Sequence, residues 1–236
     1  MILGMMNTMD SLALDLPELL ERQHLQKVLL RQSFEKMDEL VQIQSPLSHV
    51  VTAKSAVKPY ADKKAVEETK DLALPDLQPL NSLSYLFDQN IYKDDNSFCV
   101  QSQAEKFHVH TCFEIDSSIT KFRSNSEYHG RSLIMAFGSA LAQARVTYGE
   151  NVKGVLPEPI TVHFINTNGK DFYFSVFQLN TLDLEGDIKN IFWHESETAP
   201  LFETCEYVYA VPTLEGYNHD IFKKMLAMYL QNTNSV

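Results

Sequence analysis

Cysteine, positive charge and long apolar runs are all scarce in this sequence. Only three of its 236 residues are cysteines, and an odd, sparse set indicates a reducing compartment rather than a framework of disulfide bonds. Lysine and arginine number 20 against 31 aspartates and glutamates, so the formal net charge is −11. Such a chain does not coat nucleic acid with its whole surface, because phosphate contacts need clustered basic side chains. No apolar run reaches the length of a membrane span, which excludes an integral membrane protein.

The sequence also has no recognisable targeting signal. Its first twenty residues contain no lysine or arginine, unlike a secretory signal or an arginine-rich mitochondrial transit peptide. We therefore expect no transit peptide in the chain as written. The apolar share of 44% and charged share of 22% are typical of a globular protein, and the length suits one domain or one domain with an appendage.

A long helix and the hairpin that follows it organise the predicted fold. The helix over Gly130–Gly149 has a broad apolar face and only a narrow polar stripe, which predicts a helix enclosed on most sides. Asn168-Gly169 lies between two alternating runs and predicts a two-residue type I′ turn, in which Ile165 pairs with Phe172. Both faces of this hairpin are apolar, so we expect it between two packed layers.

The rest of the chain predicts an α+β fold, with a mixed or antiparallel sheet around the central hairpin, packed by the enclosed helix and a C-terminal helix. Residues 1–50 are predicted to form an N-terminal helical appendage, with truncation of a longer leading region left open, and residues 51–236 the α+β domain. The other expected elements are helices over Pro17–Ser33, Ala61–Leu74 and Ile221–Leu230, the last capped near Asn218, a connector over Ser45–Tyr60, and strands over Phe107–Ile115, Lys189–Trp193 and Tyr207–Val211.

Catalytic templates fail along the whole sequence. Gly149–Gly154 has the glycine spacing of a phosphate loop, but Val155 stands where the required lysine should follow. Gly138-Ser139 lies in the middle of the predicted helix rather than at a strand-to-helix turn. His163 lies in a crowded hairpin and is more typical of a structural histidine than of a catalyst. We therefore predict no catalytic residue and no cofactor site.

His108, His110 and Cys112 alternate along the predicted strand over Phe107–Ile115, with Cys99 nearby in the sequence. Alternation would project the three side chains to one face, where two imidazoles and a thiolate could hold zinc. The alternative is a half-polar strand face with a buried thiol. Since no cysteine pair or helical histidine pair accompanies the cluster, the alternative is favoured and no metal site is assigned.

Arg131, Gly138 and Arg145 recur every seven residues and therefore line up along one side of the long helix. A small-residue notch between two arginines would admit a partner helix, a carboxylate-bearing loop or a phosphate backbone. The alternative, which we favour, is that both arginines form salt bridges with the abundant acidic residues. These three residues are the candidate contacts with a partner or a phosphate backbone.

Several short motifs occur in an order that is typical of one protein family. They are AFGSALAQAR (Ala136–Arg145), YG (Tyr148-Gly149), VFQLNT (Val176–Thr181), DL (Asp183-Leu184), and KN (Lys189-Asn190) before Trp193. In these motifs the chain resembles the family of protein thirty-seven of the mitochondrial large ribosomal subunit, which it shares with its paralogue, programmed cell death protein nine.

This resemblance implies a non-catalytic structural constituent of the mitochondrial large ribosomal subunit, located in the matrix, supporting translation and lacking a cofactor or small-molecule substrate. It implies other large-subunit proteins as partners, among them a paralogous subunit. The acidic composition favours docking on protein with limited rRNA contact. The alternatives are a dimerisation or interaction module outside the ribosome, and a metal-dependent enzyme that uses His108, His110 and Cys112.

Overall fold

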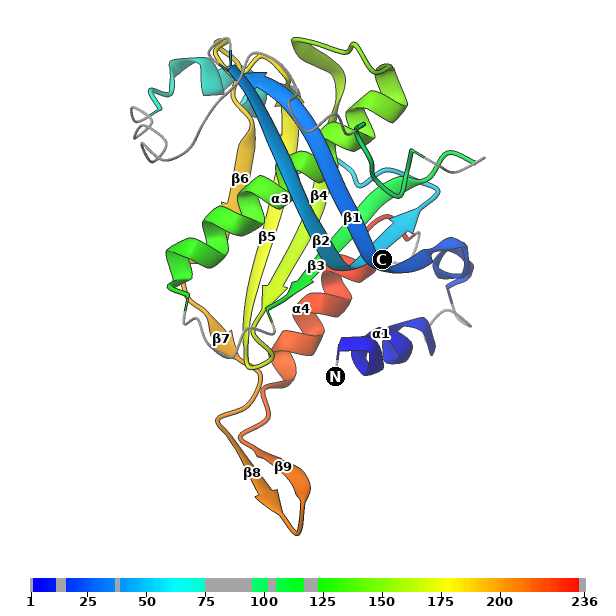
Figure 1. Cartoon of the computed structure of the whole chain (residues 1–236), viewed down its shortest axis with the longest axis vertical. Coiled ribbons are helices and arrows are strands. Elements are labelled where there is room, and N and C mark those ends of the chain that lie inside the picture. Colours follow the sequence, from blue (N-terminus) through cyan, green and yellow to red (C-terminus); the bar gives the residue numbers. More distant parts are fainter. Residues whose placement is uncertain are drawn as a thin grey trace.

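The computed structural model describes residues 2–11, 16–36, 39–74, 95–101, 105–116 and 123–233. Within these residues the chain folds as an α+β protein with a mixed sheet, as the sequence predicted (Figure 1). The elements are α1 (Ile2–Ser11), η2 (Pro17–Glu21), β1 (Gln23–Lys36), β2 (Glu39–Ala53), α2 (Lys63–Glu68), η3 (Thr69–Asp71), β3 (His108–Ile115), α3 (Asn125–Tyr148), β4 (Val155–Thr167), β5 (Asp171–Thr181), β6 (Ile191–His194), β7 (Ala199–Pro200), β8 (Thr204–Val208), β9 (Val211–Glu215) and α4 (His219–Tyr229).

The main sheet has the strand order β1-β2-β3-β4-β5-β6, and β7 pairs with one end of β5. Its neighbouring strands run antiparallel except β3 and β4, which are parallel. The long helix α3 makes the crossover between these two strands, as a parallel connection requires.

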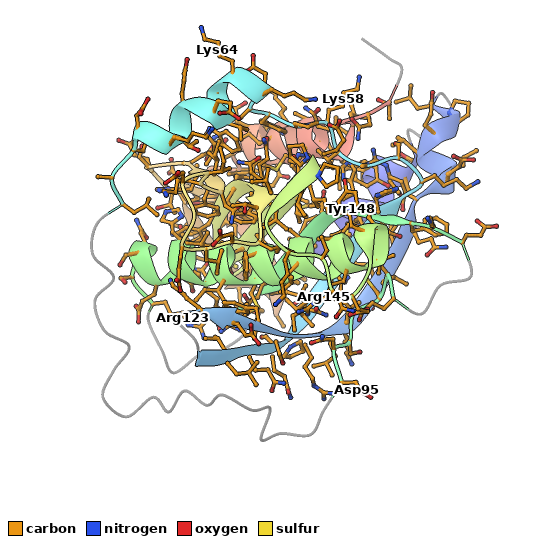
Figure 2. All side chains as sticks on the ribbon, turned by 90° about the horizontal axis from the view of Figure 1, so that it is seen from above. Lys58, Lys64, Asp95, Arg123, Arg145 and Tyr148 are labelled. Carbon is orange, nitrogen blue, oxygen red and sulfur yellow. The ribbon has the colours of Figure 1, made fainter. Side chains whose placement is uncertain are left out.

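Helix α3 lies between two parts of the same curved sheet. The long antiparallel pair of β1 and β2, here called the β1–β2 ribbon, crosses one side of α3, while β4 and β5 cover the other side (Figures 1 and 2). One apolar cluster fills this enclosed space, including Leu30, Ala140 and Phe164. A second cluster lies on the opposite face of the sheet, where Phe113 and Phe174 pack with α1 and α4. The prediction of an enclosed helix and of a hairpin between two packed layers is confirmed.

The ends of α3 follow from its sequence. Ser124 and Glu127 form a capping box at its start, in which the Ser124 side chain accepts from the Glu127 amide and Glu127 reaches back to the Ser124 amide. Gly149 ends the helix with a φ of 102°, a conformation that a residue with a Cβ rarely adopts. Its amide donates to the Arg145 carbonyl, which satisfies one of the free carbonyls of the last turn.

The hairpin of β4 and β5 forms with a register that differs from the predicted one. Ile165 pairs with Phe174, not with Phe172, so the two-residue type I′ turn is wrong. The side-chain oxygen of Asn168 accepts from the amides of Lys170 and Asp171 at 2.9 and 2.7 Å, which stabilises a longer loop. Because the shift is by two residues, every side chain keeps its predicted face of the sheet.

The helical interpretation of the N-terminal region is wrong. Helix α1 precedes this region, but of the helix predicted over Pro17–Ser33 only Pro17–Glu21 is helical, as the short η2, and Gln23–Lys36 form β1. The predicted connector over Ser45–Tyr60 is wrong as far as Ala53, because these residues continue β2. The predicted division between residues 50 and 51 falls inside β2, and as a statement about domains it stays a prediction. Leucines spaced for a helical face also suit a long strand, and pairing with a distant segment decides between the two.

Later elements agree better with the sequence. The predicted strand at Lys189–Trp193 is confirmed as β6, and the predicted C-terminal helix as α4, whose Asn218 cap accepts from the Asp220 amide. The predicted helix at Ala61–Leu74 is present but shorter, as α2 and η3. The segment Tyr207–Val211 does not extend the main sheet, because β8 and β9 form a separate two-stranded sheet.

One arginine fixes the end of α4 against the N-terminal region. Arg22 donates to the carbonyl of Tyr229 and, at 2.8 Å, to that of Gln231, and it lies 4.5 Å from the centre of the Tyr229 ring. The Tyr229 hydroxyl donates to Asp10 at the end of α1. A cation at the carbonyl end of a helix also complements the helix dipole, so these contacts hold α1 and α4 on the same face of the sheet.

None of the helices in the described part of the chain is long and apolar enough to cross a membrane.

Candidate interaction sites

The three candidate contact residues, Arg131, Gly138 and Arg145, face the β1–β2 ribbon of their own chain; they are called the arginine stripe below. Arg131 forms an ion pair with the buried carboxylate of Glu114 on β3, and its second nitrogen donates to the Ser45 hydroxyl on β2 at 3.0 Å. The first end of the stripe therefore joins α3 to two strands of the sheet.

Arg145 makes the corresponding contacts at the other end of the stripe. Its guanidinium donates to the side-chain oxygen of Gln32 at 2.7 Å and to the backbone carbonyl of Ser33 at 2.6 Å, both on β1. Figure 2 shows Arg145 on the side of α3 that the ribbon covers. Partial burial lowers the pKa of Arg145 below its ordinary value, but the group stays fully charged near neutrality.

Gly138 lies between the two arginines and admits the ribbon to close contact. A Cβ built on residue 138 would lie 3.1 Å from Cδ2 of Leu30 and 3.4 Å from Cδ1 of Ile43. The small residue therefore gives space to one apolar side chain from each ribbon strand. The stripe aligns as its spacing predicted, but the ribbon of the same chain occupies it, so contact with an outside partner stays a prediction.

The sequence placed His108, His110 and Cys112 on one strand face, and this expectation is wrong. Val51 pairs with Thr111 and Thr52 pairs with Val109, so His110 is an extra residue in the ladder, as in a β-bulge. The bulge turns His110 toward the α4 face, where its ring lies 5.2 Å from that of His163. Cys112 instead faces α3, with its sulfur 3.6 Å from the Ser139 hydroxyl.

The geometry therefore contradicts the zinc hypothesis, because the sheet separates the His110 imidazole from the Cys112 thiol. No group of three histidine, cysteine, aspartate or glutamate side chains in the described residues could hold a metal ion. Burial also raises the pKa of the Cys112 thiol well above its ordinary value, so the thiolate that zinc needs is disfavoured.

His163 and His110 are buried polar groups of the α4 face. The Tyr60 hydroxyl lies 3.1 Å from Nε2 of His163, and Nε2 of His110 lies 3.3 Å from the Gln231 carbonyl. Burial lowers the pKa of His163 to about 4, and that of His110 well below its ordinary value. Both imidazoles are therefore neutral in the folded chain at neutral pH, which fits a structural role.

These low pKa values make the stability of the fold depend on acid. An unfolded histidine titrates near pH 6.5, so between about pH 6.5 and 4 the unfolded chain binds more protons than the folded one. The contribution of the neutral imidazoles to the stability of the fold is complete above pH 6.5 and is lost as the pH falls toward 4. For His163 we expect a loss of about 3 kcal/mol across this window, measured by urea unfolding at several pH values.

A His163→Gln variant removes one of the two titrating imidazoles and should weaken this pH dependence, while His110 keeps its own contribution, whatever the stability of the variant at pH 7. The matched control is His219→Gln, because His219 is exposed at the start of α4. Equal pH dependence of wild type and His163→Gln would contradict the assignment of His163 as a buried neutral group.

The β8–β9 hairpin, residues Thr204–Glu215, is a surface that the sequence did not identify as a site. It projects away from the body of the molecule, and every residue of both strands is exposed (Figure 1). Tyr207 is 75% exposed and Tyr209, at the turn, is 97% exposed. The available signal was the run from Tyr207 to Leu214, which is rich in apolar residues and has no basic residue, between Glu206 and Glu215.

Comparisons with known proteins match this chain to mitochondrial ribosomal proteins. The family model described as mitochondrial 28S ribosomal protein S30 (PDCD9) matches residues 101–233, which is more than half of the chain. The chain therefore belongs to this family of mitochondrial ribosomal proteins, and the resemblance seen in the sequence motifs is confirmed. The match includes α3, the central hairpin, the β8–β9 hairpin and α4.

Similar proteins carry the name of one protein of the large ribosomal subunit. The large ribosomal subunit protein mL37 of Gallus gallus is 31% identical, over 94% of this chain and 54% of that protein. The proteins of the same name from Bos taurus and Mus musculus are 29% and 30% identical, each over 91% of this chain and 53% of their own length. The chain spans about half the length of the curated relatives it matches.

Proposed function

We propose that this chain is a non-catalytic structural constituent of the large subunit of the mitochondrial ribosome, located in the matrix and supporting mitochondrial translation. The observation that carries the proposal is the identity of about 30% with vertebrate mL37 proteins across nearly the whole chain. The separation of His110 from Cys112 removes the most specific argument for an enzyme.

We further propose that the chain is held in the subunit mainly by protein contacts, with limited contact to rRNA. Acidic residues outnumber basic ones by 31 to 20, and a surface of this charge is repelled by phosphate. Two of the basic side chains, Arg131 and Arg145, are used inside the fold. The expected partners are other large-subunit proteins, including a paralogous subunit of the same family.

Sucrose-gradient sedimentation of mitochondrial extract tests this function. A tagged chain is expected to migrate with the large subunit and to stay bound at about 0.5 M KCl, because protein contacts have a smaller salt dependence than phosphate contacts. A chain released in proportion to the salt concentration would contradict protein-dominated binding. A chain that stays in the light fractions, alone or paired with a paralogue, would instead support an interaction module outside the ribosome.

A further inference from the structure

The β8–β9 hairpin has two chemically different faces. Side chains of directly paired residues share a face of an antiparallel sheet, and successive pairs alternate between faces. One face therefore carries the pairs Cys205–Leu214 and Tyr207–Pro212. The opposite face carries Thr204–Glu215 and Glu206–Thr213, and near the turn Val208–Val211. The hairpin is amphipathic, with a continuous apolar face over its middle.

Nothing in the described part of the chain covers this apolar face. Tyr207 is 75% exposed and Leu214 is 41% exposed, and the hairpin lies apart from both apolar clusters of the body (Figure 1). A sheet with one apolar face ordinarily packs that face against another layer, and an isolated two-stranded hairpin is at best marginally stable in water. The missing layer must come from outside the described residues.

The base of the hairpin is fixed to the body, so the apolar face is presented at a defined place. The Glu203 amide donates to the Glu215 carbonyl at 2.9 Å, and the Asn218 amide donates to the carbonyl of the buried Leu201 at 2.8 Å. Lys170, in the loop between β4 and β5, donates to the Glu203 carbonyl at 2.7 Å. These bonds connect both legs of the hairpin to the sheet and to the start of α4.

The turn of the hairpin exposes an aromatic side chain at a cost in backbone strain. Tyr209 and Ala210 have φ values of 51° and 63°, a combination for which hairpins favour asparagine and glycine. Left-handed backbone is disfavoured for a residue with a Cβ. Residues in such conformations cluster at binding sites, and the 97% exposed Tyr209 ring stands at the end of the projection.

The charge of the hairpin defines the kind of partner that it fits. The segment from residue 202 to residue 217 contains Glu203, Glu206 and Glu215 and no lysine or arginine. An RNA partner is disfavoured, because three carboxylates repel phosphate and no basic side chain within the segment compensates for them. A protein groove with an apolar floor complements the apolar face, and lysine or arginine on its rim, level with the opposite face of the inserted hairpin, complements Glu206 and Glu215.

We propose that the β8–β9 hairpin is a docking arm that inserts its apolar face, with Tyr207 and Leu214 as anchors, into a basic-rimmed apolar groove of another protein. Aromatic side chains at the centre of a covered patch commonly carry most of the binding energy of an interface. This inference deepens the proposed function, on which it rests for the expectation that the partner is a large-subunit protein.

Photo-crosslinking on the two faces of the same hairpin tests the proposal. The full chain, carrying p-benzoylphenylalanine at position 207 or at position 213, is expressed in cells, irradiated and recovered from mitochondria. Position 207 lies on the apolar face and position 213 on the polar face. We expect crosslinks at least tenfold stronger from position 207, to a protein segment that mass spectrometry shows to be apolar and flanked by lysine or arginine. Crosslinks to RNA, to the same chain or to a second copy of it, or no crosslinks, would overturn the docking arm.

Substitutions separate this inference from the proposed function. Tyr207→Ser and Leu214→Ser should each lower the crosslinked or co-sedimenting fraction at least tenfold, whereas the polar-face control Thr213→Ser should change it less than twofold. Because these side chains are exposed, the melting temperature should not change. If the wild type co-sediments and none of the variants weakens this co-sedimentation, the docking arm is overturned and the ribosomal function stands. A wild-type chain outside the ribosome that still crosslinks through position 207 to a basic-rimmed groove would support the arm and overturn the ribosomal function.

Discussion

Replacement of Gly138 by valine is expected to lower the free energy of unfolding by about 3 kcal/mol. A Cβ at this position already lies 3.1 Å from Leu30 and 3.4 Å from Ile43, so the two additional methyl groups of valine have no space beneath the ribbon. The strain should concentrate where the ribbon crosses α3. Hydrogen exchange at the amides of β1 and β2 should therefore accelerate more than exchange in α4.

Two substitutions calibrate the effect of this valine. Gly138→Ala adds only the Cβ against the flexible end of Leu30 and improves helix propensity, so we expect a change within about 1 kcal/mol. Gly130→Val places the same side chain in the same helix, where a Cβ would meet no atom within 4 Å. If valine at positions 130 and 138 had equal effects on the melting curve, close packing of the ribbon on Gly138 would be contradicted.

Replacement of Arg131 by methionine is expected to destabilise the fold by about 3 kcal/mol, because it leaves the buried carboxylate of Glu114 without its counter-ion. Burial raises the pKa of Glu114 and Arg131 lowers it, so removing the arginine raises this pKa further. A group with a raised pKa in the folded state is stabilising at low pH and loses that contribution as the pH rises. The damage measured by urea unfolding should therefore be smaller at about pH 5 than at about pH 8.

A double variant distinguishes the ion pair from general packing. Adding Glu114→Gln to Arg131→Met removes the uncompensated charge and should restore at least half of the lost stability. Lys223→Met, which breaks the fully exposed pair with Asp220, should cause no measurable change. Equal stability of the single and double variants would show that Arg131 acts through its contacts with Ser45 and the ribbon instead.

Local sequence patterns predicted the part of the fold that is contiguous in the chain. The apolar arc of α3, the alternation of β4 and β5 and the Asn218 cap of α4 each specify their element from a short window. The register of the hairpin was missed because the Asn168 side chain binds two amides of the loop, a contact that the Asn-Gly rule does not include. The bulge at His110 was missed because strict alternation cannot show an inserted residue.

Long-range pairing explains the larger errors. The β1–β2 ribbon depends on contacts with α3, and nothing within residues 17–53 shows that Leu30 and Ile43 will meet Gly138. The arginine stripe was correctly aligned from its spacing, while the element that covers it belongs to this distant part of the chain. One strand over Tyr207–Val211 was predicted to extend the main sheet, but this segment contains the turn between β8 and β9, and an exposed apolar strand has the same sequence pattern as a buried one.

Because α3 packs beneath the ribbon, the order of synthesis determines when the ribbon can reach its final packing. Both ribbon strands leave the ribosome before any residue of α3 has been made, because β2 ends at Ala53 and α3 begins at Asn125. Until the helix arrives, Leu30 and Ile43 have no surface to pack against, and the nascent chain carries an apolar strand pair that other strands or chaperones can bind. Conditions that slow elongation between residues 54 and 124 would lengthen that interval, so aggregation of this chain should depend on translation speed through the segment as well as on the stability of the finished fold.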